Sequence, residues 1–151
     1  MRRRLGNLAL LVSTLLVLFA SDRALLSWLG LPLWEADPVL RFRHRPGAIG
    51  SWGPAFDDKP IRINRLGFHD DEFPTRKPDG ELRILVLGDS VVMGHGVLAS
   101  EAFPNRLEAM LGAANPGGFR SFQVINAGVQ GYSTYQYLEV LRRSLAERIR
   151  R

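Results

Sequence analysis

The sequence predicts an α/β fold preceded by an N-terminal transmembrane helix. Two short apolar runs, 82–87 and 122–126, each lead into a turn that contains glycine, and each is followed by a segment with helical spacing of apolar residues. Apolar runs of this length bounded by glycine are typical of buried strands in a parallel sheet. A longer run, from Leu5 to Ala20, opens the chain behind three arginines and is apolar apart from Asn7, Ser13 and Thr14.

The N-terminal run carries the features of a membrane anchor. As a helix it spans roughly 24 Å, slightly less than the roughly 30 Å of a bilayer's hydrocarbon core. The stretch from Leu25 to Trp34, with tryptophans suited to the interface, extends it. A cleaved signal peptide is the alternative, although a cut after Ala20 places Leu18 where a small residue is usual. We expect an uncleaved anchor with Arg2 to Arg4 in the cytoplasm and the rest of the chain in the periplasm or outside the cell.

Length, charge and cysteine content limit the classes of protein to which the chain can belong. With 151 residues, the chain holds one ordinary domain at most. Its 20 Lys and Arg against 15 Asp and Glu give a net charge of +5, but the arginines gather near both ends without alternating aromatic residues. That distribution argues against a nucleic-acid partner, since stacking surfaces need such aromatics. Because cysteine is absent, there is no disulfide and no thiolate nucleophile.

We divide the chain into three regions. Residues 1–34 form the anchor and juxtamembrane segment, and residues 35–80 form a connector in which frequent Pro and Gly exclude long helices. In the connector, Ile61 to Asn64 alternate apolar and polar residues, as in a short edge strand or a small hairpin. Residues 81–151 form the α/β portion.

The α/β portion is predicted to be a βαβα unit. A strand over 82–87 is followed by a helix from Ser100 to about Leu111, and a strand over 122–126 by a helix that begins with the capping box Ser133 to Gln136. We expect the two strands to be parallel, with a right-handed crossover between them. Since two parallel strands bury only part of their apolar surface, we expect the front part of a larger domain.

The first strand ends in Gly88-Asp89-Ser90, which places a serine hydroxyl at the carboxyl end of a parallel strand. Open α/β sheets hold reactive groups at this edge. Ser90 is the candidate nucleophile, and the N–H groups of Ser90 and Gly131 are candidate donors to an oxyanion. The simpler interpretation is that Asp89 and Ser90 only cap a helix.

Together, the Gly-Asp-Ser block, Phe103-Pro104 with the helix after it, and the block from Asn126 to Gly131 resemble the SGNH (GDSL) hydrolase family. The resemblance covers roughly 82–141 and implies a flavodoxin-like three-layer sandwich, here truncated. It implies that Ser90 is the nucleophile, that Gly131 is an oxyanion donor and that Asn126 braces the turn, with Gly88 and Asp89 supporting the motif. The segment from Asn64 to Asp70 also looks like one that precedes the catalytic strand in membrane-anchored relatives and alginate-acetyltransferase-like proteins.

The sequence departs from this family in its missing base. Neither the later Gly-x-Asn-Asp block nor the Asp-x-x-His pair occurs in the 151 residues. His95, five residues after Ser90, is a surrogate base, whereas His44 is expected to be a solvated connector residue. His69 stands beside three acidic residues, but consecutive carboxylates point in different directions, so a solvated turn is expected in place of a metal site. No metal and no cofactor are predicted.

These observations predict a membrane-anchored serine ester hydrolase that acts on acyl or O-acetyl esters. An O-acylated glycan or lipid is the expected substrate, and the membrane, through the N-terminal helix, the expected contact. Because the catalytic histidine is absent, the 151 residues alone are expected to be nearly inactive. The alternative is a non-catalytic membrane-tethered remnant or an O-acetyltransferase-like protein of envelope polysaccharide.

Overall fold

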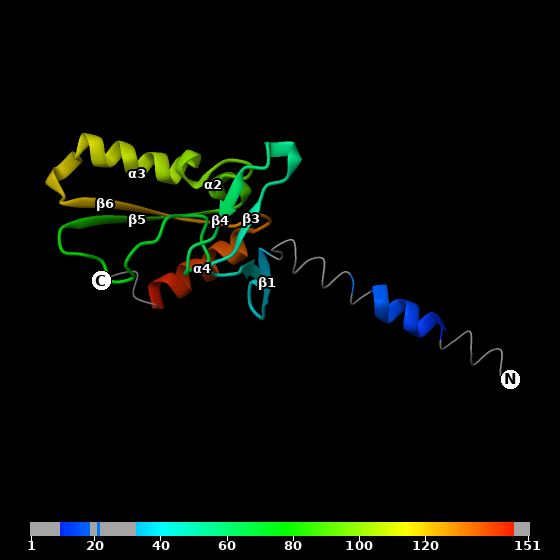
Figure 1. Ribbon diagram of the computed structural model, residues 1–151. Helices are drawn as coiled ribbons and strands as arrows, with labels where there is room; N and C mark the ends of the chain where they lie inside the picture. Colours follow the sequence, from blue (N-terminus) through cyan, green and yellow to red (C-terminus); the bar gives the residue numbers. More distant parts are fainter. Residues whose placement is uncertain (1–9, 19–20, 22–32, 147–151) are drawn as a thin grey trace. The chain divides into compact units, whose positions relative to one another are not determined.

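Two parallel strands form the centre of the fold. β5 (Glu81–Gly88) and β6 (Ser121–Gly128) pair along their whole length, with Gly88 opposite Gly128. They contain both apolar runs expected from the sequence, and their carboxyl ends lie at one edge of the sheet (Figure 1). The computed structural model describes residues 10–18, 21 and 33–146.

Two helices separate β5 from β6. The short α2 (Ser90–Met93) follows β5 directly, and α3 (Phe103–Ala114) packs against β6. Pro104 stands in the first turn of α3, where a missing N–H costs no helical hydrogen bond. The helix ends at Asn115, which adopts a left-handed conformation with φ 42°. Short 3-10 turns occur at Pro54–Phe56, Ala99–Glu101 and Pro116–Gly118.

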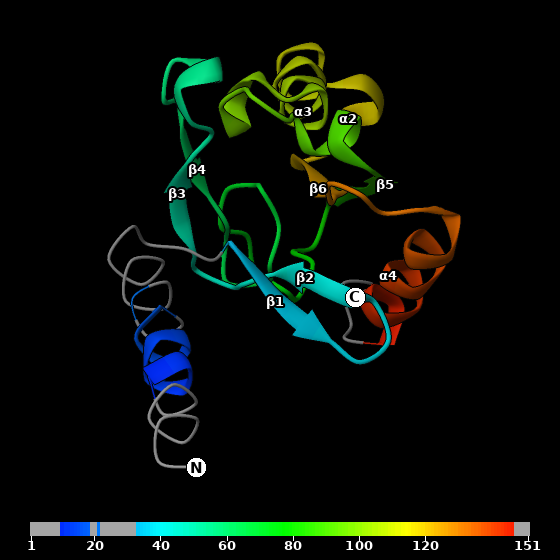
Figure 2. The same ribbon diagram turned by 90° about the vertical axis from the view of Figure 1, so that its right-hand side faces the viewer.

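The last described helix, α4 (Thr134–Ala146), lies on the other side of the β5–β6 pair from α3 (Figures 1 and 2). At its start the Gln136 side chain accepts a hydrogen bond from the Ser133 N–H at 2.9 Å and another from the Ser133 hydroxyl. The N–H groups at the start of a helix have no carbonyl partner within the helix, so this side chain supplies one. One face of the helix is buried through Gln136, Val140 and Ser144.

The segment expected to be a connector holds two antiparallel strand pairs. β1 (Trp34–Asp37) pairs with β2 (Arg41–His44), and β3 (Ile49–Ser51) pairs with β4 (Pro60–Arg62). In the described part of the chain, neither pair joins the parallel strands.

One cluster of buried apolar side chains joins this segment to the parallel sheet. The segment before β5 contributes three of its members, and β6, the turn after it and α4 contribute the others. The members are Leu40, Phe68, Phe73, Ile125, Ala127, Val129, Tyr132 and Val140. Burying a Leu or Phe side chain contributes roughly 1.5–3 kcal/mol. Residues 33–80 therefore stabilise the same core as the parallel strands.

An ion pair also connects the first hairpin to α4. Both carboxylate oxygens of Asp37 accept hydrogen bonds from Arg143, at 2.7 and 2.9 Å. Asp37 also accepts the N–H groups of Val39 and Leu40, which closes the turn between β1 and β2. The Arg143 guanidinium holds the pKa of Asp37 well below its usual range. Such bidentate, charge-assisted bonds are among the stronger ones in proteins.

The expected flavodoxin-like three-layer sandwich is wrong. That fold requires one parallel sheet of several strands, whereas the described residues form three two-stranded sheets, of which only β5–β6 is parallel. The structure is a small mixed α/β domain. The reason lies in residues 33–62, where strands of three or four residues are joined by short connections. Short connections permit only antiparallel pairing, because a parallel pair needs a crossover of about a dozen residues or more.

The expected N-terminal transmembrane helix is not supported. In the compact unit Met1–Pro32, residues 10–18 form a helix with exposed side chains. Within residues 10–18, 21 and 33–146, no helix combines the length and the hydropathy needed to cross a membrane. Arg2 to Arg4, and most of the stretch from Leu25 to Trp34, lie outside the described residues.

Candidate active site

Ser90 lies two residues beyond β5 and begins α2. Asp89 makes the capping bond of this helix, because its carboxylate accepts the Val91 N–H at 2.9 Å. The helix ends after one turn at Gly94, which has φ 79° and donates its N–H to the Ser90 carbonyl at 3.1 Å. Ser90 is partly exposed. Its hydroxyl is therefore not needed for the cap that Asp89 provides.

Two glycines allow α2 to lie directly on the ends of the strands. A Cβ on Gly88 would come within 2.1 Å of the Val92 side chain, and a Cβ on Gly128 within 2.2 Å of the Met93 backbone nitrogen. Non-bonded contacts are favourable only near about 3.5–4.0 Å, so neither position has room for a side chain. The motif glycine Gly88 thus has a packing function: it determines how closely the helix that carries Ser90 approaches the sheet.

Gly131 lies in the turn that follows β6. It has φ 80°, a conformation that glycine adopts without the strain of a Cβ. The neighbouring Tyr132 fixes the turn, because its hydroxyl donates to the Phe42 carbonyl of β2 at 2.9 Å. Gly131 is exposed, and its N–H donates to no backbone carbonyl in the described part of the chain. Since β5 and β6 end in register, the segments that carry Ser90 and Gly131 leave the same edge of the sheet.

Asn126 is fully buried behind this edge and connects both segments. Its side-chain oxygen accepts the Gly128 N–H at 3.2 Å, and its amide donates to the Met93 carbonyl at 3.3 Å and to the His69 carbonyl at 3.4 Å. One side chain therefore holds the end of β6, the end of α2 and the segment before β5 together.

His69 and Asp70 complete this buried network. His69 Nδ1 donates to the Met93 carbonyl at 2.9 Å, while Asp70 accepts the Asn126 N–H at 2.9 Å and the Asn105 side-chain amide at 2.6 Å. Burial lowers the pKa of His69 and raises the pKa of Asp70. The imidazole is therefore neutral near pH 7, with its proton on Nδ1, as the bond to a carbonyl requires.

The expectation of a solvated turn at His69 is wrong. His69 is 1% exposed and Asp70 6% exposed, while Asp71 and Glu72 face solvent. Carboxylates next to each other do point in different directions, but one of these directions leads into the core, where backbone N–H groups need an acceptor. Among the described residues, no group of three or more acidic or histidine side chains is placed to hold a metal ion.

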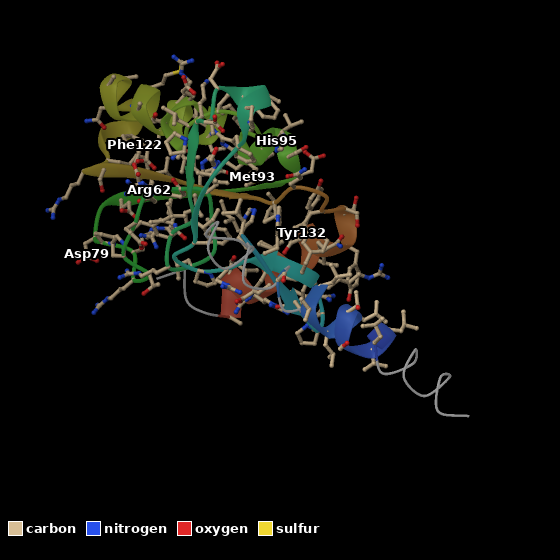
Figure 3. The ribbon with its side chains drawn as sticks, turned by 45° about the vertical axis from the view of Figure 1, so that its right-hand side comes forward. Arg62, Asp79, Met93, His95, Phe122 and Tyr132 are labelled. Atoms are coloured by element: carbon tan, nitrogen blue, oxygen red, sulfur yellow. The ribbon has the colours of Figure 1, made fainter. Side chains whose placement is uncertain are left out.

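Ser90 lines an open pocket of about 420 Å³. His95 lines the same pocket and is exposed, whereas Met93 is fully buried (Figure 3). The His95 ring meets Trp52 and Phe56 edge-on, with ring centroids 4.6 and 5.1 Å apart. The other lining residues are mostly apolar and comprise Val91, Gly94, Val97, Glu101, Ala102 and Phe103.

The three histidines thus differ in what they can do. The expectation that His44 is solvated is wrong: it is fully buried, with Nδ1 3.3 Å from the Gly67 carbonyl and its ring centroid 4.3 Å from that of Trp34. Burial lowers the pKa of His44 to about 4. Because His44 and His69 are buried on backbone carbonyls, His95 is the histidine that shares a pocket with Ser90.

Sequence reasoning missed the contribution of Trp52 to this site. Its indole N–H donates to the Val97 carbonyl at 2.9 Å, which fastens the β3–β4 segment to the loop after α2. A lone Trp between Ser and Gly in a segment of low periodicity carries no signal for such a contact. The burial of His69 and Asp70 has no local sequence signal either, although the segment from Asn64 to Asp70 carries a family resemblance.

Comparisons of the chain with protein-family models, with curated proteins and with solved structures find no match.

Proposed function

We propose that the chain carries the nucleophile and the oxyanion donors of a serine ester hydrolase of the SGNH (GDSL) type. The observation that supports this proposal is the placement of Ser90 and Gly131. They follow the in-register ends of two parallel strands, and Gly131 is an exposed residue whose N–H donates to no backbone carbonyl in the described part of the chain. Acyl transfer needs a nucleophile and backbone donors close to the same reacting atom, and two groups that leave one edge of a parallel sheet are candidates for this role.

In this proposal, the Ser90 hydroxyl oxygen attacks the carbonyl carbon of an ester while a base takes its proton. The oxyanion of the tetrahedral intermediate accepts the N–H groups of Ser90 and Gly131. The intermediate collapses to an acyl-serine and releases the alcohol, which receives the proton from the base. Water then attacks the acyl-serine and frees the acid; if a sugar hydroxyl attacks in its place, the product is an O-acylated sugar.

His95 is the residue that we assign as the base within these 151 residues. It shares the pocket with Ser90, and Trp52 and Phe56 hold its ring beside the opening. Among the described residues, no carboxylate is hydrogen-bonded to the His95 ring to orient it, so we expect slow turnover. Loss of a positioned histidine costs up to about a millionfold in a serine hydrolase.

The pocket wall suggests where the substrate lies. Val91, Val97 and Phe103 present apolar side chains beside Ser90, and Val91 is 74% exposed. We assign this wall to the acyl group of the ester. That the ester belongs to an O-acylated glycan or lipid, met outside the cytoplasm, stays a prediction from the family resemblance.

A non-catalytic binding protein is the second candidate. The observation in its favour is that Gly88, Asp89 and Asn126 all have packing or capping functions that need no reaction at Ser90. In that case these three residues serve only the packing and capping of the fold.

Hydrolysis of a short-chain aryl ester by the purified 151-residue chain distinguishes these candidates. We expect turnover above that of a Ser90→Ala variant, with a short-lived acyl group on Ser90 detectable by mass spectrometry after rapid acid quenching. Ser121→Ala is the matched control, because it removes an exposed hydroxyl at the start of β6, the end of the parallel pair away from Ser90. Equal rates for the wild type and Ser90→Ala would favour the binding protein.

A further inference from the structure

The two outer edges of the parallel pair differ in how their backbone N–H groups are used. On β6, side chains accept the N–H groups that point away from β5. Glu108 accepts the Val124 N–H at 2.6 Å, and Asp70 accepts the Asn126 N–H at 2.9 Å. The Asn126 side chain accepts the next one, the Gly128 N–H, at 3.2 Å. The outer edge of β6 is therefore closed to a further strand.

The outward groups of β5 have no such partners. Neighbouring parallel strands bond at alternate residues, and the Val129 N–H bonds the Gly88 carbonyl, so the even-numbered residues of β5 face β6. The outward residues are then Arg83, Leu85 and Leu87. None of their backbone N–H or carbonyl groups has a hydrogen-bond partner among the described residues. An edge of this kind is a template for pairing with another chain.

The backbone of β5 is reachable from solvent at this edge. The Arg83 side chain is only 4% exposed, yet the residue as a whole is not buried, so its exposed surface belongs mainly to the backbone. Leu85 and Leu87 are also partly exposed, whereas the positions of β6 that pair with them are buried. Figure 2 shows β6 between β5 and the β3–β4 pair, which leaves β5 as the outer strand on its side.

β5 lacks the features that usually protect an edge strand. Natural edges are kept from pairing by short length, by proline or by charged side chains. β5 has eight residues and no proline, and its two charged residues, Glu81 and Arg83, pair with each other at 2.7 Å with buried side chains. The remaining residues before Gly88 are apolar on both faces of the strand. Nothing on β5 itself therefore opposes the addition of a strand.

The outward groups of β5 are complementary to those of a second β5. In an antiparallel pair, two opposed residues exchange both of their N–H···O bonds at alternate positions. With a two-fold axis at Leu85, this residue opposes its own copy, and Arg83 opposes Leu87. Every outward N–H then meets an outward carbonyl, and none is left over. No two like charges oppose each other in this register.

An apolar row on α4, which packs against β5, extends this edge. Arg143 binds one side of α4 to the β1–β2 hairpin. Leu138, Leu141 and Leu145 lie at helical spacing beyond the opposite side of the buried row, and Leu138 and Leu145 are 45% and 37% exposed. Figure 2 shows the hairpin to the left of α4 and β5 above it, so this row lies on the side of the free edge.

We propose that the chain forms a two-fold symmetric dimer in which the β5 strands of two copies pair antiparallel, centred on Leu85. The joined sheet has the order β6–β5–β5–β6, and the two α4 helices lie on the same face of it with their apolar rows toward each other. Such two-fold dimers are the commonest oligomers of soluble proteins. The proposal does not depend on the reaction proposed for Ser90.

Introduced cysteines test the register, because the chain has none of its own. The two Leu85 Cα atoms of the proposed pair lie about 5.5 Å apart, within the range of a disulfide. We expect Leu85→Cys to form a disulfide-linked dimer in glutathione buffer, seen by non-reducing electrophoresis. Ile84→Cys is the matched control on the same strand: the two Ile84 Cα atoms are diagonal neighbours about 7–8 Å apart, too far to be bridged. Equal cross-linking of the two variants would overturn the proposal.

Sedimentation equilibrium of the 151-residue chain tests the dimer itself. Leu85→Pro removes one outward N–H from each copy but no bond to β6, a change that an edge strand tolerates. Leu85→Ala also shortens the side chain but keeps the N–H. We expect the dimer of Leu85→Pro to dissociate at least about thirtyfold more readily than that of Leu85→Ala, because two hydrogen bonds of about fivefold each are lost.

Two results of the sedimentation experiment would overturn the proposal. One is a wild-type chain that stays monomeric up to about 1 mM, and the other is a folded Leu85→Pro that dimerises as tightly as Leu85→Ala. Association through another segment, such as the exposed side chains of residues 10–18, would affect these variants equally. If Leu85→Pro does not fold, the comparison of Leu85→Cys with Ile84→Cys decides.

Discussion

Replacing Gly128 with alanine tests the packing of α2 most severely. The added Cβ would lie 2.2 Å from the Met93 nitrogen and 2.7 Å from the Val92 carbonyl carbon. Both neighbours are backbone atoms, so no side-chain rotation relieves the overlap. To reach ordinary contact, α2 has to move away from the sheet by roughly 1 Å.

The expected cost is large for one methyl group. Overpacking of a well-packed interior costs about 1–3 kcal/mol, and we expect the upper end because the helix backbone itself must shift. A loss of about 3 kcal/mol lowers the melting temperature of a chain of this length by about 6–12 °C. The free energy of unfolding is measured by urea titration with circular dichroism, and the melting temperature by calorimetry.

Gly112→Ala is the matched control, because the same methyl group meets nothing within 4 Å on α3. Alanine is the better helix former, so this variant is expected to gain up to about 1 kcal/mol. The two substitutions should therefore change stability in opposite directions. If Gly128→Ala proves as stable as Gly112→Ala, the close approach of α2 to the sheet is refuted.

Three further predictions follow from single side chains. Asp37→Asn is expected to lower the free energy of unfolding by about 2–3 kcal/mol at pH 7, because it weakens two charge-assisted bonds to Arg143. Since folding lowers the pKa of Asp37, the stability that this carboxylate contributes is present above its unfolded pKa of about 4 and is lost as the pH falls below that value. Urea titrations of the wild type and the variant should therefore converge in acid. Folding lowers the pKa of His44 from 6.5 to about 4, so the free energy of unfolding is highest above pH 6.5 and falls as the pH is lowered toward 4. The loss over this interval is about 3 kcal/mol, and the urea unfolding of His44→Phe should depend correspondingly less on pH. Tyr132→Phe removes the hydroxyl that bonds the Phe42 carbonyl and should cost about 1 kcal/mol by the same measurement, whereas an unchanged stability would mean that this bond does not hold the turn of Gly131.

The parallel strands were predictable because their signal is local. Each apolar run is bounded by polar residues and followed by glycine, and β5 and β6 extend only one or two residues beyond the predicted limits of 82–87 and 122–126. The placement of Ser90 just beyond β5 was predictable for the same reason, since a glycine at the end of a buried strand marks where the chain turns.

The overall architecture was not predictable from these runs. Whether a two-stranded parallel pair is extended by further strands depends on residues distant in the sequence, and here the strands of residues 33–62 pair only with one another in the described structure. The three-layer sandwich was inferred from a family resemblance and from the exposed apolar surface that two strands leave. Leu40, Phe68 and Phe73 cover part of this surface instead.

The histidines illustrate a second limit. A histidine among arginines, such as His44, is usually solvated, yet its ring packs against Trp34 at a tilt and is fully buried. Similarly, His69 and Asp70 stand in a polar segment but satisfy the Met93 carbonyl and the Asn126 N–H. Both cases depend on backbone groups of other segments that need partners, which local sequence does not reveal.

We propose that Ser90 and Gly131 act on one point in space. The most direct test is a crystal structure of the chain whose Ser90 has been modified by a small aryl phosphonate ester, which leaves a tetrahedral phosphoryl group on the hydroxyl oxygen. We expect a phosphoryl oxygen to lie about 2.7–3.1 Å from the backbone nitrogens of both Ser90 and Gly131. A phosphoryl oxygen that points away from Gly131, or modification at another serine, would contradict it.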